Sequence, residues 1–394
     1  MDQLVNTIRP YAWGSTTALP ALTGTEPDGT PRAELWMGAH PSAPSRVHRG
    51  SGPEPLDALI EAAPAAELGE ATLRRFGPRL PFLLKLLAAD SPLSLQVHPD
   101  LAQAAIGFKI EEAQGVPLVA PHRNYRDDNH KPEMIVALSP FDGLCGFRPP
   151  AQCADLLDAL GLPELAHHAA ALRAEPEESA LRAVFSAFLA ASPDLIDAVT
   201  TAVARAARSA GPHRSAFEAY EAVSRAHPGD GGLLAALMLH HVRLAPGEGL
   251  FLGAGVPHAY LHGLGVELMA ASDNVLRCGL TTKHVDAEEL LRVVRFTAAP
   301  VRILRPTARG GEEVYPAPVD DFRLSRIRRP GADLDASAPQ ILVCTRGRIR
   351  LTSPSGTLTL QPGDSAYAPA GERLTVSGDG EVFRATVGPE GART

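Results

Sequence analysis

The chain has 394 residues, of which 45% are apolar and 21% are charged, as in an ordinary globular protein. This length predicts two or three domains and excludes a peptide, a lone finger or a disulfide miniprotein. The formal net charge of −8 works against non-specific attraction to nucleic acid or to an anionic membrane. We therefore expect a protein without nucleic-acid or membrane partners, in which a local cationic site holds any anionic substrate.

The N-terminus and the cysteines indicate a cytoplasmic protein, which we expect to be a monomer. The start, MDQLVNTIRPYAWG, lacks the charged region and apolar run of a secretion signal. No stretch reaches the roughly 18 apolar residues of a membrane span. Cys145, Cys153, Cys278 and Cys344 lack C-x-x-C spacing, which favours reduced, buried thiols over a zinc ribbon or disulfides.

The predicted elements change in kind along the chain. Residues 1–150 contain short apolar runs broken by Pro and Gly, which predicts short strands with a few helices. Residues 151–230 are rich in Ala and Leu, and their apolar positions recur at three and four, which predicts a helical insertion. Strands return in residues 231–305, with a short helix over 287–296. Residues 306–394 alternate polar and apolar positions, which is typical of antiparallel β structure.

A weak internal repeat relates the last two β regions. PGEGLFLGAG at 246–255 and PGDSAYAPAG at 362–371 align without gaps at an offset of 116 residues. Two copies of one β unit would produce this match, although the turn chemistry shared by β proteins would also do so. At this offset His258 corresponds to Leu374, so only the first copy can bind a metal through that position.

Four segments carry the candidate chemistry. In PLSLQVHPD, Gln96 and His98 are two apart on a predicted strand and share a face; the alternative is a half-buried strand with its polar side in solvent. NHKPEMIVAL sets His130, Lys131 and Glu133 before an apolar strand, and GAGVPHAYLHG sets His258 after a turn. A four-ligand site of nitrogen and oxygen donors, suited to zinc, would comprise Gln96, His98, Glu133 and His258.

The remaining segment, VELMAASDNVLRCGLTTKHVD, contains Glu267, Asp273, Arg277 and Lys283. Its charges either are solvated and paired, or supply an acid for proton transfer and cations for an oxyanion or phosphate. The chain contains 33 arginines but only four lysines. Three of these lysines, Lys85, Lys131 and Lys283, lie in these or neighbouring segments. Seven further histidines are expected on the surface or in the core, without a metal-binding role: His40, His48, His122, His167, His168, His213 and His227.

Taken together, six segments resemble the type I mannose-6-phosphate isomerases of the cupin superfamily. They are NTIRPYAWGS, ELWMGAHPSAPS, FLLKLLAADSPLSLQVHPD, NHKPEM, GVPHAYLHG and AASDNVLRCGLT, in the family's order from residue 6 to about 286. The resemblance implies cupin, jelly-roll-like β-barrels, with two barrel units and a helical domain. Residues 1–150 and 231–305 would form the catalytic barrel, 151–230 the helical insertion, and 306–394 a cupin-like β domain without metal ligands.

The resemblance also implies an activity, which is the reversible isomerisation of mannose 6-phosphate and fructose 6-phosphate through a cis-enediolate, with one zinc ion per chain. The family's metal ligands fall on the four residues named above, and its essential arginine falls on Arg277. Lys85 and Lys131 match lysines of its pocket, and Lys283 closes the last motif.

Two roles stay open at this stage. The base could be Glu267, Lys131, His130 or Asp273, and phosphate could bind to Lys85, Lys131, Arg277 or Lys283. Two other functions were weighed: an iron-dependent cupin oxygenase, because His98, Glu133 and His258 contain two histidines and a carboxylate, and a non-catalytic sugar-binding cupin.

Overall fold

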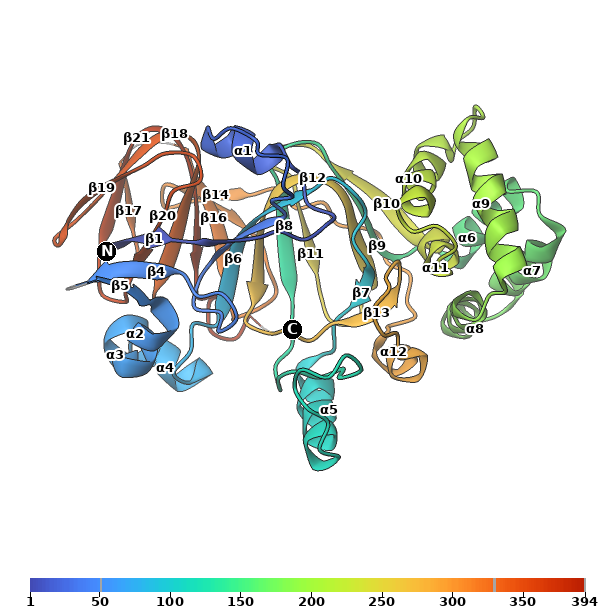
Figure 1. Cartoon of the computed structure of the whole chain (residues 1–394), viewed down its shortest axis with the longest axis horizontal. Helices are drawn as coiled ribbons and strands as arrows, with labels where there is room; N and C mark the ends of the chain where they lie inside the picture. Colours follow the sequence, from blue (N-terminus) through green and yellow to red (C-terminus); the bar gives the residue numbers. More distant parts are fainter. Residues whose placement is uncertain (50–51, 329–330, 393–394) are drawn as a thin grey trace.

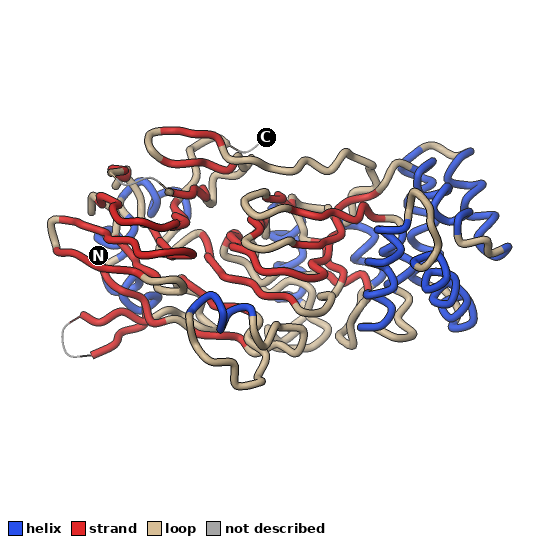
Figure 2. The backbone as a smooth tube through the Cα atoms, turned by 90° about the horizontal axis from the view of Figure 1, so that it is seen from above, coloured by secondary structure: helices blue, strands red, loops and turns tan. Residues whose placement is uncertain are grey.

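The computed structural model describes residues 1–49, 52–328 and 331–392. Two β-sheets and a block of helices lie in a row along the longest axis of the molecule (Figure 1). Seen from above, strands fill the middle and one end, and helices fill the other end (Figure 2). The predicted class, mainly β structure with a helical insertion and two β units, is confirmed.

The first sheet contains ten strands within the described residues. Its strands pair with one another in antiparallel fashion. These strands are β2 (Thr7–Arg9), β3 (Glu34–Met37), β6 (Phe82–Ala89), β7 (Leu95–Val97), β8 (Glu133–Ala137), β9 (Phe141–Phe147), β10 (Leu239–Leu244), β11 (Gly249–Leu252), β12 (His258–Ala270) and β13 (Leu276–Gly279). The long strand β12 pairs with β6, β7, β8 and β9, so the sheet wraps around it.

The second sheet has eleven strands within the described residues and joins both ends of the chain. They are β1 (Asp2–Val5), β4 (Arg46–Arg49), β5 (Gly52–Pro55), β14 (Thr307–Arg309), β15 (Glu312–Tyr315), β16 (Arg323–Ile327), β17 (Ala332–Leu334), β18 (Gln340–Ser353), β19 (Gly356–Leu360), β20 (Ser365–Ala368) and β21 (Leu374–Thr386). Because β1 pairs with both β20 and β4, three N-terminal strands extend the C-terminal sheet. The division of the chain into domains at 150, 230 and 305 stays a prediction.

Half of the α-helices in the described residues gather in the predicted insertion and directly after it, at the right of Figure 1. This region contains α6 (Pro150–Ala159), a 3-10 turn (Pro163–Leu165), α7 (Ala166–Ala174), α8 (Glu177–Leu189), α9 (Pro193–Ala207), α10 (Arg214–Ala226) and α11 (Gly232–Leu237). The other helices are α1 (Ala18–Thr23), α2 (Leu56–Ala62), α3 (Pro64–Leu68), α4 (Glu70–Phe76), α5 (Leu101–Ala113) and α12 (Ala287–Val293). As predicted, strands return within residues 231–305, beginning with β10 after the short helix α11.

The structure supports the internal repeat. Adding the offset of 116 residues to the bounds of β11 gives those of β20, and adding it to β12 gives the bounds of β21. Turn chemistry alone would not reproduce two strands of matching length in a row. The equivalent of His258 is Leu374, which is buried among apolar side chains of the second sheet.

A bulge in β12 decides which of its side chains face inward. The pairing of β12 with β9 shifts register between Tyr260 and His262, and Gly263 follows with φ +129°. A Cβ at Gly263 would lie 2.7 Å from the carbonyl oxygen of Pro140, so a side chain does not fit there. Because such a shift exchanges the two faces of a strand, an even-numbered residue, His258, and an odd-numbered residue, Glu267, face the same cavity.

Continuous apolar cores join the parts. One buried cluster contains Leu4, Val136, Tyr367 and Phe383 and so spans both sheets, while another joins the insertion helices to Leu95 and other residues of the first sheet. All four cysteines are free and buried, as predicted. Within the described ranges no single helix is long and apolar enough to span a membrane; α8 and α9 pass that test only as a pair bent by 105°.

The second sheet also buries an ion pair. Arg384 donates to Glu312 at 2.9 and 3.2 Å, to Gln340 Oε1 at 2.7 Å and to the carbonyl of Asp335 at 2.6 Å. Arg384 is 1% exposed and Glu312 is 7% exposed. Removing one partner from such a pair leaves a buried charge without compensation.

We therefore expect Glu312→Ala to lower the free energy of unfolding by about 3–5 kcal/mol without changing metal content. The matched control is Glu313→Ala, since the neighbouring Glu313 pairs with Arg326 and Arg328 nearer the surface and its loss should cost under about 1 kcal/mol. Urea denaturation of both variants measures the difference. Equal losses would contradict this account of the second sheet.

Candidate metal and sugar-phosphate site

Three neighbouring strands bring the key side chains together. In the short strand β7, Gln96 pairs with His258 of β12 on one side and with Arg277 of β13 on the other. The chain leaves β7 through His98 and Pro99, and Asp100 then caps α5 by accepting a hydrogen bond from the backbone of Gln103 at 2.8 Å. The HPD sequence thus ends a strand and begins a helix, which fixes His98 at the junction.

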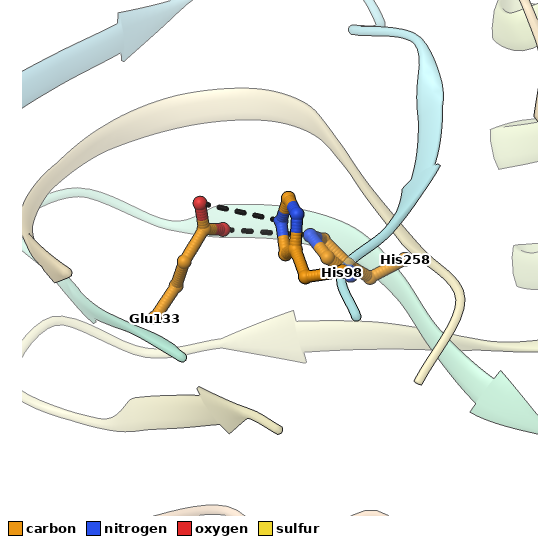
Figure 3. A group of neighbouring side chains, drawn as sticks. All are labelled: His98, Glu133 and His258. Atoms are coloured by element: carbon orange, nitrogen blue, oxygen red, sulfur yellow. Dashed lines mark ion pairs between the residues drawn. The ribbon is translucent and has the colours of Figure 1, made fainter. Parts of the chain in front are cut away.

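His98, Glu133 and His258 converge in the interior of the first sheet (Figure 3). Glu133 Oε1 lies 3.4 Å from Nε2 of His98, and Oε2 lies 3.4 Å from Nε2 of His258. The three residues are buried, and one ligand atom from each lies within 4.8 Å of the others. Two imidazoles and a carboxylate so arranged can hold a divalent metal ion.

The other ring nitrogens fix the orientation of both histidines. Nδ1 of His98 lies 2.8 Å from the carbonyl oxygen of Asn274, and Nδ1 of His258 lies 2.9 Å from that of Val256. A carbonyl only accepts, so each Nδ1 donates a proton to it and each ring turns Nε2 toward Glu133. Burial lowers the pKa of His98 to about 4, and its Nε2 has no hydrogen-bond partner among the described residues. A metal ion would satisfy that buried atom.

Charged side chains surround this group. Lys131 Nζ lies 3.0 Å from Glu133 Oε1. Burial acts to raise the pKa of Glu133, but the Lys131 ammonium and the two histidines hold it well below its usual range. Glu133 is therefore an anionic ligand at neutral pH.

A second buried pair lies across the strands β6 and β12. Lys85 and Glu267 are directly opposite each other, and Lys85 Nζ lies 2.8 Å from Glu267 Oε2 and 3.7 Å from Glu34 Oε1. Burial raises the pKa of Glu267, although Lys85 acts in the opposite sense. For Lys85, burial acts to lower the pKa, and Glu267 and Glu34 more than offset this.

These five buried groups do not balance in charge. Glu34, Glu133 and Glu267 are three carboxylates, whereas Lys85 and Lys131 are two ammonium groups. When all are ionised, one negative charge is in excess in a region where an uncompensated charge is costly. A divalent cation bound to Glu133 and the two imidazoles would compensate this excess negative charge.

The group borders a cavity of about 1000 Å³, and the cations on its wall include Arg126, Arg277 and Lys283. Burial and the neighbouring Arg126 lower the pKa of Arg277. Burial, Arg277 and Arg126 lower the pKa of Lys283. Within the described part of the chain, none of these three cations forms an ion pair. They converge on the open space and are suited to a multiply charged anion.

The cavity collects most of the sequence-predicted residues. Lining it are Lys85, Gln96, Lys131, Glu133, His258, Glu267, Asp273, Arg277 and Lys283, with His98 buried behind them. His130 is the exception: its Nε2 lies 2.9 Å from Asp321 of the C-terminal region, and it does not line the cavity. Its position next to Lys131 misled the sequence analysis, because successive residues of an extended chain point to opposite faces.

Several cavity residues were missed. His40 and His227, which were assigned to surface or core, both line the cavity, and His40 Nε2 lies 3.2 Å from Asp273 Oδ1. Arg126 and Tyr260 were also missed, although Arg126 lies four residues before His130 and Tyr260 two residues after His258. The period of a strand could have revealed Tyr260; nothing local distinguishes His40 or His227.

Comparisons with known proteins agree with this geometry. A profile of the type I phosphomannose isomerase catalytic domain matches residues 1–150. Mannose-6-phosphate isomerase of Escherichia coli (strain K12) is 40% identical over 98% of this chain and 99% of the relative. The enzyme of the same name from Bos taurus is 33% identical over 96% of each chain.

Solved structures are also similar over nearly the whole chain. A structure described as mannose 6-phosphate isomerase with zinc bound has a TM-score of 0.91 at 37% identity, covering 98% of this chain and 99% of that one. A mutant of phosphomannose isomerase from Salmonella typhimurium has a TM-score of 0.92 at 37% identity, covering 99% of this chain and 100% of that one.

Single substitutions test the metal ligands. We expect His98→Ala, Glu133→Ala and His258→Ala each to lose bound metal, because each substitution removes one of the donor atoms that would bind it. Gln96→Ala should have a milder effect, since a neutral amide oxygen is the weakest donor. Elemental analysis of the purified variants measures this, with exposed His48→Ala as control. A folded His258→Ala protein with full metal content would show that the ligands are wrongly assigned.

Proposed function

The chain belongs to the type I phosphomannose isomerase family, and we propose that it interconverts D-mannose 6-phosphate and D-fructose 6-phosphate through the residues described above. The observation that carries this proposal is that one cavity borders both the His98–Glu133–His258 group and the cations Arg126, Arg277 and Lys283. The reaction needs ring opening, removal of the proton on C2 and its return to C1 through a cis-enediolate. The cavity offers acid–base groups for these transfers and cations for the phosphate.

We propose that His98, Glu133 and His258, with Gln96 as fourth ligand, hold one zinc ion. Bound zinc supplies a Lewis acid, which makes the proton next to a sugar carbonyl easier to remove. The chain's own contribution is to orient both imidazoles through the carbonyls of Asn274 and Val256. Lys131 holds Glu133 ionised, as a ligand must be.

We assign the cations two roles. Arg277 pairs in the sheet with Gln96 and is thus next to the metal group, so it is suited to the negative charge that develops on the enediolate. Lys283 and Arg126 also line the cavity and are suited to the phosphate. A phosphate so held fixes the position of the reacting carbons through binding energy remote from them.

Three candidates remain for the base, namely Lys131, Asp273 and Glu267. Lys131 is paired with Glu133, and Asp273 is paired with His40. In each pair the pKa of the carboxylate is lowered, so the carboxylate stays ionised. We favour Glu267, because burial raises the pKa of this carboxylate and so makes it a stronger base, while Lys85 at 2.8 Å keeps it ionised.

The other functions weighed are not favoured. An iron oxygenase would use the same two histidines and carboxylate, but it has no use for Arg126 and Lys283 converging on the cavity. We further propose a cytoplasmic monomer whose partner is a small phosphosugar rather than nucleic acid or membrane. The net charge of −8 supports the part of this proposal that concerns nucleic acid and membranes.

The activity is tested with mannose 6-phosphate as the sole addition to zinc-loaded protein. We expect fructose 6-phosphate to form reversibly, and activity to disappear with a chelator and return with zinc. Deuterium placed at C2 should be carried to C1 or lost to solvent, and partial exchange with solvent would establish proton transfer. Equal turnover of mannose and mannose 6-phosphate, or turnover that depends on oxygen and iron, would contradict the proposal.

Arg277 is tested separately from folding. We expect Arg277→Ala to retain zinc and the folded structure but to lose at least tenfold in kcat, because its charge acts on the transition state. Arg277→Lys should recover little if both guanidinium nitrogens contact substrate. Steady-state kinetics on both variants measure this. An unchanged kcat in the alanine variant would leave Arg277 with a structural role only.

A further inference from the structure

The exit from the helical insertion is built against the substrate cavity. Residues 227–231 connect α10 to α11, next to the predicted boundary of the insertion at residue 230. His227 at their start lines the cavity. The segment packs against the loop that follows β13, residues 280–284, which also lines the cavity and carries Lys283.

One carboxylate joins the two segments. Asp230 Oδ1 accepts a hydrogen bond from the backbone nitrogen of Gly232 at 2.7 Å, and Oδ2 accepts one from that of Thr281 at 2.9 Å. The first hydrogen bond lies within the turn at the end of the insertion. The second joins this turn to the cavity loop, 51 residues later in the chain. Hydrogen bonds to a charged acceptor are stronger than neutral ones, so this link is well suited to hold a loop.

The backbones of the two segments touch at a pair of glycines. A Cβ built on Gly232 would lie 2.6 Å from the backbone nitrogen of Leu280, and one built on Gly279 would lie 2.6 Å from the Cα of Gly232. Gly279 also has φ +127°. Both positions therefore require glycine, and the loop is seated directly on the insertion.

The residue at this contact is strained. Leu280 has φ +57°, and it is the one non-glycine residue with positive φ in the described part of the chain. This left-handed conformation is unfavourable for an L-residue with a side chain. Its side chain is 1% exposed and belongs to the apolar cluster that contains Leu233 and Leu234 of α11. The insertion thus holds the loop in a conformation it would not adopt alone.

The strained loop controls where a cation sits. Arg277 precedes it on β13 and Lys283 ends it, and the backbone nitrogen of Lys283 donates to Oγ1 of Thr281 at 3.1 Å. Three like charges, including Arg126, share one wall and repel each other while no anion is bound. Because Lys283 is exposed, a loop free to move would let its ammonium turn away from Arg277 and Arg126.

We propose that Asp230 is a positioning residue that anchors the Thr281–Lys283 loop to the helical insertion and thereby sets the affinity of the cavity for the phosphate group of the substrate. This inference rests on the proposed function. It gives the insertion a role in choosing phosphorylated over unphosphorylated sugars. Asp230 itself acts through the loop, and it is absent from the residues that line the cavity.

The test compares Asp230→Ala with Asp230→Asn, which keeps the volume but turns one acceptor into a donor. For Asp230→Ala we expect kcat/KM for mannose 6-phosphate to fall about tenfold, mainly through KM, and to fall more than it does for mannose. The inhibition constant of inorganic phosphate should rise by the same factor at unchanged zinc content. Asp230→Asn should lie between this variant and the natural chain. The control is Asp197→Ala, an exposed acid on α9 of the same insertion.

A merely structural role would lower activity on both sugars in parallel, and an unchanged ratio in the folded variants would overturn the proposal. If Asp230→Ala does not fold, the activities on the two sugars are compared in the isosteric variant Asp230→Asn instead. Combining Asp230→Ala with Lys283→Ala gives a second criterion. Since Asp230 acts through Lys283, the two losses of phosphate affinity should be less than additive, and full additivity would contradict the mechanism.

The two hypotheses fail in different ways. If the natural chain does not isomerise mannose 6-phosphate, the proposed function fails. Calorimetric binding of inorganic phosphate to the zinc-loaded protein still tests Asp230, because the anchored loop should bind phosphate more tightly than the loop in the variants.

Discussion

Burying charge inside a β-barrel is the constraint on which the rest of this structure depends. An isolated ion in such an interior is costly, so each charge must have a partner. Here Glu133 is paired with Lys131, and Glu267 with Lys85, each at hydrogen-bond distance. The bulge in β12 makes this possible, because it lets one strand present both His258 and Glu267 to the same space. The carboxylate in excess and two imidazole lone pairs then form a site for a divalent cation.

The sequence predicted the site better than it predicted the layout around it. Gln96 and His98 could be placed on one face of a strand because the strand period is a local property, and the motif order indicated the cavity. His130 could not be excluded, since its partner Asp321 lies 191 residues away in the chain. His40 was missed for the same reason, because its contact with Asp273 depends on tertiary structure.

The fold shows the same limit. The repeat offset of 116 residues, seen in a ten-residue match, reproduces the bounds of two successive strands in each copy. In contrast, the six residues of α11, GLLAAL, are apolar throughout and entirely buried, so their pattern has no period that separates a helix from a strand. The N-terminal strands were expected in the first barrel, and their pairing with β20 depends on contacts that no local pattern encodes.

The two β units have diverged around one position. The first begins its long strand with His258 and surrounds a polar cavity, whereas the second begins the equivalent strand with Leu374 and fills its interior with apolar residues. Its buried charge, Arg384, is fully paired, and no group of ligands suited to a metal was found there in the described ranges. The second unit and the helical insertion therefore support the first, the insertion by forming one wall of the cavity.

The central claim is that zinc in this protein is bound by imidazole nitrogen and carboxylate and amide oxygen inside the first barrel. Zinc K-edge X-ray absorption of the purified protein tests it most directly. The account predicts nitrogen and oxygen neighbours at about 2.0–2.1 Å, the scattering pattern of two imidazoles, and no sulfur. A sulfur shell at about 2.3 Å would place the metal on cysteine and contradict the account.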